Sequence, residues 1–166
     1  EMHQAMLAMM RGEEHEDNGR ARVEIHRDRL FEDSMRQLNQ LGPKLKRKVQ
    51  VSFINQHGTQ EAGIDGGGVF KEFIDDLIKE AFSAEDSTAS HRLFAVTPLE
   101  TLKVNTDLMN EQALLPQYEF LGRVLGKAVY ESILVEPQFC LPFLNQLLGK
   151  SNTLEDLKNF DQEYYR

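Results

Sequence analysis

The densest glycine cluster in this chain lies where a loop runs into an amphipathic helix. Four of the eleven glycines fall between Gly63 and Gly68, within the sequence EAGIDGGGVFKEF that spans residues 61–73. Glycine loses more conformational freedom on folding than any other residue, so such a cluster indicates a backbone requirement that side chains would violate. The first chemistry to consider is therefore a phosphate cradle, in which backbone N–H groups surround an anion.

The residues around these glycines argue against phosphate binding. A P-loop needs Lys followed by Ser or Thr after its last glycine, and a dinucleotide-binding turn needs GxGxxG after a strand. Val69 and Phe70 follow Gly68 instead, and the Asp65 carboxylate would lie where the anion must bind. We therefore expect an architectural loop, in which Asp65 caps the next helix and the glycines let the chain pass close to a neighbouring segment.

The other candidate nucleophiles are also weak. Cys140 is the only cysteine in the sequence, and its neighbours include Phe139 and Leu141. A reactive thiolate needs a nearby cation, a histidine or a helix N-terminus, so Cys140 is predicted to be a buried structural residue. Ser52 and Ser132 match no triad signature, and the five histidines are scattered. We predict no catalytic residue, no metal site and no cofactor site within this sequence.

The charged residues are interpreted mainly as solvated surface. Glu61 and Asp65 are four residues apart, as are Asp75 and Lys79, and such pairs usually lie on an exposed face. The basic run at residues 44–48 is interpreted in the same way, because the formal net charge of −8 argues against a nucleic-acid partner. No apolar run reaches the ~18 residues that a membrane span needs, so no membrane association is expected. A single cysteine fits a reducing compartment, which suggests a cytoplasmic or nuclear protein.

Four short strands can be predicted from alternating or β-branched residues. The first covers residues 22–26 and the second residues 49–54, closed by a turn at 55–58. The other two cover residues 93–96 and 101–104, and Pro98 between them favours a hairpin-like connection. A helix between the first two strands should begin at a cap formed by Asp28 or Asp33 and should end at Gly42.

The remaining helices follow from apolar residues at helical spacing. One helix should cover residues 69–82, a long one residues 112–134 and a short apolar one residues 139–148, and Asp161 should cap a last helix. Gly122 and Gly126 lie four residues apart on the long helix, which predicts that another element crosses close to its backbone there. A helix at residues 1–10 and a linker at 12–19 are also expected. The fold class is therefore α+β and mostly helical, with a few short strands. The stripe predicted to be buried on the long helix is Tyr118, Leu121, Val124, Leu125, Ala128, Val129 and Ile133.

Taken in order, these segments resemble the amino-terminal lobe of the HECT-type ubiquitin-protein ligases. The resemblance covers roughly residues 23–166, as a partial HECT domain at 22–166 that follows an upstream helix and linker at 1–21. Several ordered motifs at compatible spacing are far more specific than one glycine loop. The matching segments are RLFEDS at 29–34, VQVSF at 49–53, EAGIDGGGVFKEF at 61–73, LF at 93–94, YEFLGRVLGKAVYE at 118–131, FxxxLLG at 143–149 and LxxxDxEYY at 157–165.

The resemblance implies a two-lobed transferase. In this family a ubiquitin-conjugating enzyme docks on the amino-terminal lobe, and ubiquitin passes to a cysteine on the carboxy-terminal lobe as a thioester and then to a substrate lysine. The implied partners are therefore a conjugating enzyme, ubiquitin and protein substrates. The branch that looks nearest contains proteasome-associated, chain-elongating ligases, which adds the proteasome as a candidate partner.

The sequence departs from the family pattern at the nucleophile. The family's cysteine lies in a Thr-Cys-Phe context near the carboxy terminus, whereas Cys140 follows Phe139 and occurs too early in the order. The nucleophile is thus expected beyond Arg166, and this piece is expected to be an inactive scaffold that exposes apolar surface. Phe139, Phe143 and Tyr164 are candidates for that surface, although the sequence equally allows them in the core. The alternative function is a non-catalytic helical module that binds a partner protein.

Overall fold

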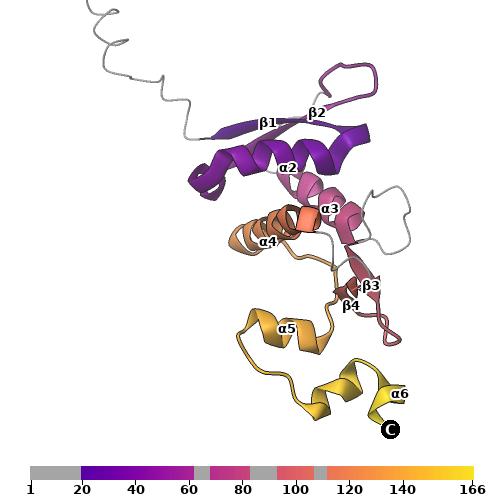
Figure 1. Ribbon diagram of the computed structural model, residues 1–166. Helices are drawn as coiled ribbons and strands as arrows, with labels where there is room; N and C mark the ends of the chain where they lie inside the picture. The colour runs from indigo at the N-terminus through magenta and orange to yellow at the C-terminus, as the bar shows by residue number, and fades with distance from the viewer. Residues whose placement is uncertain (1–19, 62–67, 83–92, 107–111) are drawn as a thin grey trace, which may run out of the picture.

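The computed structural model describes residues 20–61, 68–82, 93–106 and 112–166. The expected helix at 1–10, the linker at 12–19, the cap at Asp65 and most of the glycine loop lie outside the described residues. Within them, two strands alternate with two helices, and a small two-stranded hairpin and then a series of helices follow. This order agrees with a mostly helical α+β fold (Figure 1). No helix among the described residues combines the length and apolarity that crossing a membrane requires.

The first layer is a parallel pair of strands, β1 (Ala21–His26) and β2 (Val49–Ile54). Ala21 lies opposite Val49, and this register continues for six residues to His26 and Ile54. Alternate side chains of both strands, including Val23 and Val51, are buried, so both predicted strands are confirmed. The predicted turn is also confirmed, because the Gly58 N–H donates to the Asn55 carbonyl.

Helix α2 (Leu30–Leu41) connects these strands and lies along them (Figure 1). The predicted cap is wrong: residues 27–29 form a 3-10 turn, and the residue before the helix is Arg29, whose side chain makes no capping bond. Asp33 lies inside the helix instead, and its carboxylate accepts hydrogen bonds from the backbone N–H of His26 at 3.1 Å and from His26 Nδ1 at 2.6 Å. The predicted end at Gly42 is confirmed, with a φ of 50° that favours glycine.

Asp33 should make the stability of this chain sensitive to acid. Its side chain is only 5% exposed, and burial alone would raise its pKa. The hydrogen bonds from His26 and the charge of Arg36, whose Nη2 lies 2.7 Å from Oδ1, outweigh burial and lower the pKa. A pKa that is lower in the folded state than in the unfolded chain stabilises the fold above the unfolded value of about 4 and loses that effect as pH falls through the folded value.

We expect the free energy of unfolding, measured by urea denaturation, to fall as the pH is lowered from about 5. Asp33→Asn should lower stability at pH 7 and flatten this acid dependence relative to the unmodified chain. The pKa of Asp156 is also lowered, by hydrogen bonds from the backbone and side chain of Thr153, and Asp156 is present in both proteins. The difference between their free energies of unfolding as a function of pH therefore reports Asp33. Parallel curves for the two proteins would contradict this assignment.

The second layer contains α3 (Gly68–Phe82), α4 (Leu115–Tyr130) and a small hairpin. The hairpin strands are β3 (Phe94–Val96) and β4 (Leu102–Val104), which pair antiparallel as predicted. The predicted helix at 69–82 is confirmed, and it supplies buried core residues, namely Phe73, Ile74, Leu77, Ile78 and Phe82.

The long helix is shorter than predicted. Residues 112–114 form a 3-10 turn, and α4 ends at Tyr130 rather than near residue 134. Ser132 adopts a left-handed φ of 57°, and the Ile133 N–H donates to the Ala128 carbonyl, which is a Schellman-type end without a glycine. Val129, predicted to be buried, is exposed, whereas Phe120, absent from the predicted stripe, is completely buried.

The last segment contains α5 (Leu141–Leu147), a 3-10 turn (Leu154–Asn159) and α6 (Gln162–Tyr165). Helix α5 begins later than predicted, because the preceding residues form a parallel bridge to Leu102 through bonds of 2.7 and 2.9 Å. The predicted cap at Asp161 is confirmed, since its side chain accepts from the N–H groups of Glu163 and Tyr164. No residue of α5 is buried, so this apolar helix lies on the surface of the described chain.

Candidate functional site

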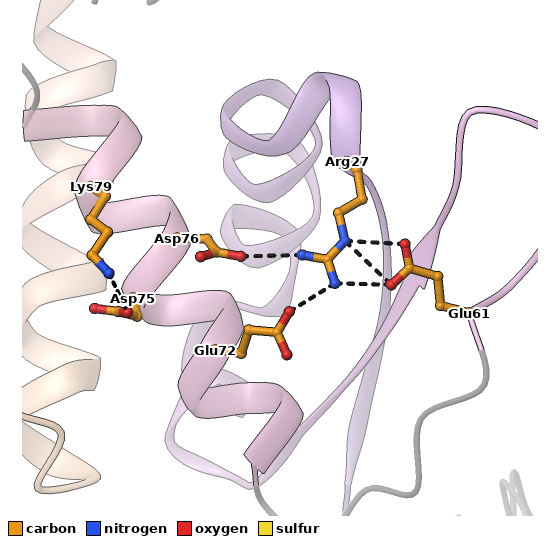
Figure 2. Close-up of polar contacts among 6 residues, drawn as sticks. All are labelled: Arg27, Glu61, Glu72, Asp75, Asp76 and Lys79. Carbon is orange, nitrogen blue, oxygen red and sulfur yellow. Dashed lines mark hydrogen bonds and ion pairs between the residues drawn. The ribbon is translucent and has the colours of Figure 1, made fainter.

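The guanidinium of Arg27 lies at the centre of a cluster formed by three carboxylates (Figure 2). Nη2 donates to Glu61 at 2.9 Å and to Glu72 at 2.8 Å, and Nη1 donates to Asp76 at 3.2 Å. The guanidinium also lies 3.7 Å from the centre of the Phe53 ring. These contacts join the turn after β1, the residue just before the glycine loop and the helix just after it.

The carboxylates of the Arg27 cluster differ in their electrostatics. The hydrogen bond from Arg27 lowers the pKa of Glu61 and raises that of the guanidinium itself. Burial raises the pKa of Asp76, and the neighbouring Glu72 and Asp75 add to this against the effect of Arg27. The contacts of Arg27 connect the segments before and after the glycine loop. One cation is shared by three carboxylates, so the cluster carries more negative than positive charge.

The sequence did not indicate this cluster. Glu61 was expected to be solvated surface, but it pairs with an arginine 34 residues away. The pairing arises because β1 lies parallel to β2, so the end of β1 comes next to the segment that follows β2. No local motif carries that information. The Asp75–Lys79 pair, with Nζ 2.8 Å from the carboxylate, matches the expectation of an exposed pair one helical turn apart.

Arg27→Gln should lower the free energy of unfolding by about 2 kcal/mol, because it leaves three carboxylates close together and uncovers one face of Phe53. The side chain is about one-third exposed, so screening already reduces its contribution. We expect the loss in urea denaturation to be smaller in 1 M salt. Lys79→Gln is the matched control and should cause no measurable change; equal losses for both variants would contradict a special role for Arg27.

Lys127 is the one buried lysine or arginine among the residues that the structure describes. It is 5% exposed, and its Nζ donates to the Arg47 carbonyl at 2.9 Å and to Glu131. The rings of Phe70 and Tyr130 lie 5.5 and 5.4 Å from Nζ. The bond from the Lys127 ammonium to the Arg47 carbonyl therefore joins α4 to the segment that leads into β2.

Cys140 is buried, and it lies in the bridge that connects β4 to α5. Its backbone N–H donates to the Leu102 carbonyl at 2.9 Å. This burial agrees with the expectation of a structural cysteine. Its lack of a catalytic role stays a prediction.

An apolar groove lies between α4 and α5 and has a volume of about 600 Å³. Phe94 and Tyr118 line it, and the Tyr118 hydroxyl donates to the Leu93 carbonyl at 2.6 Å. Phe143 is half-buried and belongs to an aromatic cluster with Phe94 and Phe139. Of the three candidates for exposed apolar surface, Tyr164 is exposed, whereas Phe139 and Phe143 are half-buried and pack against the core.

The predicted close crossing at Gly122 and Gly126 is not found among the described residues. Apart from the backbone of α4 itself, a Cβ atom built on either glycine would meet no atom of the described residues within 4 Å. Gly122 lines the groove, so no element of the described residues crosses α4 closely at that point.

Comparisons with known proteins agree with the resemblance seen in the sequence. The family described as HECT-domain (ubiquitin-transferase) matches residues 76–166, which are 91 of the 166 residues. E3 ubiquitin-protein ligase UPL6 of Arabidopsis thaliana is 38% identical over 89% of this chain and 14% of its own length. Ubiquitin-protein ligase E3B of Homo sapiens is 36% identical over 87% of this chain and 14% of its own length. E3 ubiquitin-protein ligase HUL5 of Saccharomyces cerevisiae is 34% identical over 85% of this chain and 15% of its own length.

Because the family match covers more than half of the sequence, this chain belongs to the HECT-domain (ubiquitin-transferase) family. The chain spans about one-seventh of the length of these curated relatives. The activity of a full-length ligase is therefore a proposal for the polypeptide that contains these residues.

Proposed function

We propose that residues 22–166 form the scaffold part of the amino-terminal lobe of a HECT-type ubiquitin-protein transferase. The complete enzyme would receive ubiquitin from a conjugating enzyme as a cysteine thioester and pass it to lysines of substrate proteins. The family match at residues 76–166 carries this proposal. The burial of Cys140 supports it, because the only thiol of the chain is enclosed by the fold rather than presented to a partner.

The proposal predicts that the 166-residue chain forms no thioester by itself. Purified protein incubated with ubiquitin-charged conjugating enzyme should show no reducible ubiquitin adduct on a non-reducing gel. A polypeptide that also contains the downstream nucleophile should form one. An adduct on the 166-residue chain that disappears in Cys140→Ala would overturn the structural role of Cys140, and Ser52→Ala serves as a control that leaves the thiol in place.

The finer assignments within the family are also part of this proposal. The branch with proteasome-associated, chain-elongating ligases is proposed from the sequence motifs, together with a cytoplasmic or nuclear location. Co-purification of the full-length polypeptide with proteasomes tests the branch, and assembly of ubiquitin chains rather than single ubiquitins tests chain elongation.

The alternative is a non-catalytic module, for which the open groove is the favouring observation. Apolar grooves between helices commonly receive an amphipathic helix from a partner. The longest natural polypeptide that contains these residues distinguishes the two functions. The enzyme requires a Thr-Cys motif downstream of these residues, whereas the module does not.

A further inference from the structure

The turn that connects α2 to β2 concentrates positive charge on an acidic protein. This basic turn, residues 44–48, contains four cations, and the side chains of Lys44, Lys46, Arg47 and Lys48 are all exposed. The ion pairs within the described part of the chain include none of these four side chains. Because the formal net charge of the chain is −8, this local excess of positive charge fits a negatively charged partner.

The backbone of the basic turn is fixed by the rest of the fold. Leu45 packs against the hydrophobic core. The Arg47 N–H donates to the Lys44 carbonyl at 2.9 Å, and the Arg47 carbonyl accepts from Lys127 Nζ at 2.9 Å. A partner therefore meets cations on a backbone that is already ordered, which lowers the entropic cost of binding.

A negatively charged segment of the same chain leads toward this turn. This acidic segment, residues 13–17, reads EEHED and carries four carboxylates. Four residues later the chain enters β1 at Ala21, whose N–H donates to the Lys48 carbonyl at 2.9 Å. Since Ala21 lies opposite Val49 in the parallel register, the start of β1 and the turn after α2 lie at the same end of this layer (Figure 1). The chain that precedes β1 therefore approaches the basic turn without reversing its direction.

The short connection gives the acidic segment an advantage over any separate acidic molecule. Asp17 is four residues before Ala21, so even a fully extended chain places the two Cα atoms within about 14 Å of each other. For Glu13, eight residues before Ala21, the limit is about 28 Å. A connection this short gives an effective concentration in the millimolar range. A separate acidic partner would have to be present at a comparable concentration in order to compete.

We propose that the acidic segment at residues 13–17 docks in cis on the basic turn at residues 44–48. Its carboxylates then pair with the lysine and arginine side chains of the turn. Each exposed ion pair stabilises little by itself, but several pairs in one contact act together. The contact holds the start of β1 against β2, where the bond between Ala21 and Lys48 lies. It does not depend on the transferase activity, because both segments belong to this chain.

Carbodiimide cross-linking tests the contact directly, because it joins a carboxylate to a lysine ammonium where the two groups form an ion pair. Mass spectrometry of the 166-residue chain at low salt should find cross-links from residues 13–17 to Lys44, Lys46 or Lys48. These cross-links should become rare in 1 M salt, where the Debye length falls to about 3 Å. An equal mixture of ¹⁴N- and ¹⁵N-labelled chains distinguishes the occupants of the turn. Cross-links within one isotope support the cis contact, whereas mixed-isotope cross-links would identify a second copy and overturn it.

Exchanging the charges of the two segments tests whether they recognise each other. Reversing the acidic segment, by Glu14→Lys and Glu16→Lys, should accelerate hydrogen exchange of the Ala21 amide about two- to fivefold at low salt. Reversing the basic turn, by Lys46→Glu and Lys48→Glu, should have the same effect. A chain with all four substitutions should exchange at the rate of the unmodified chain, because opposite charges face each other again.

The matched control reverses two cations outside both segments, by Lys150→Glu and Arg166→Glu, whose side chains are exposed. This control should leave the exchange of the Ala21 amide unchanged. The cis contact is excluded if the unmodified chain gives no cross-link between the two segments, or if the effects of the two reversals add instead of cancelling. Binding of the unmodified chain to phosphatidylserine vesicles that is lost when the basic turn is reversed would also exclude it, because the turn would then be free to bind a membrane.

Discussion

Replacing Lys127 by alanine should lower the free energy of unfolding by about 3 kcal/mol, since removing one partner of a buried ion pair leaves the others unsatisfied. The Arg47 carbonyl would lose its bond of 2.9 Å, and Glu131 would lose its cation. The Glu131 side chain is only partly exposed, so water replaces the ammonium incompletely. The stem of Lys127 also fills space beside Phe70, which alanine would leave open.

Lys127→Met separates these effects, because it keeps most of the stem and removes the charge. We expect urea denaturation to show a loss for this variant about half that of Lys127→Ala. A double-mutant cycle with Glu131→Gln should give a coupling of about 1 kcal/mol or more. Lys71→Ala on the exposed face of α3 is the matched control and should be nearly neutral. If Lys127→Met is as stable as the unmodified chain, the ion pair contributes nothing and only packing matters.

The sequence predicts the parallel strands well because each carries its own periodic signal. Val23 and Ile25 alternate with polar residues in β1, and Val49, Val51 and Phe53 do so in β2. A strand with one buried face must alternate in this way, so local sequence is sufficient. Which strand pairs with which is not local, and the parallel order appears only in the structure.

Helix α4 shows where periodicity stops being informative. Apolar residues surround most of this helix, so more than one stripe satisfies the helical spacing. The predicted stripe included Val129, which is exposed, and omitted Phe120, which is buried against Phe31 of α2. Its early end depends on the left-handed conformation of Ser132, a residue that seldom signals a helix end.

The polar clusters could not be predicted because their members are far apart in the sequence. Arg27 and Glu72 are separated by 45 residues, and Lys127 and Arg47 by 80. The Arg47 group is also a backbone carbonyl, which no residue type reveals. The sequence did identify the family, since its motifs are contiguous, but the contacts that position those motifs depend on the tertiary fold.

Replacing Phe120 by alanine should destabilise the chain even more than the loss of Lys127. The Phe120 side chain is 0% exposed and meets the Phe31 ring edge-on, with ring centres 5.6 Å apart. Removing a fully buried phenylalanine costs about 3–5 kcal/mol, through lost burial and the cavity left behind. The edge-to-face contact adds to this, so we expect about 4 kcal/mol in urea denaturation, close to the total stability of many small domains.

Phe143→Ala is the matched control, because it removes the same side chain from the half-buried floor of the groove. Part of the Phe143 ring is already in contact with water, and no complete cavity forms when it is removed, so the loss should be about 1–2 kcal/mol. The denaturant dependence should stay unchanged for Phe143→Ala, whereas Phe120→Ala should separate α4 from α2 and weaken cooperativity. Equal losses for the two variants would mean that the groove floor is packed as tightly as the core and that the groove is closed in solution.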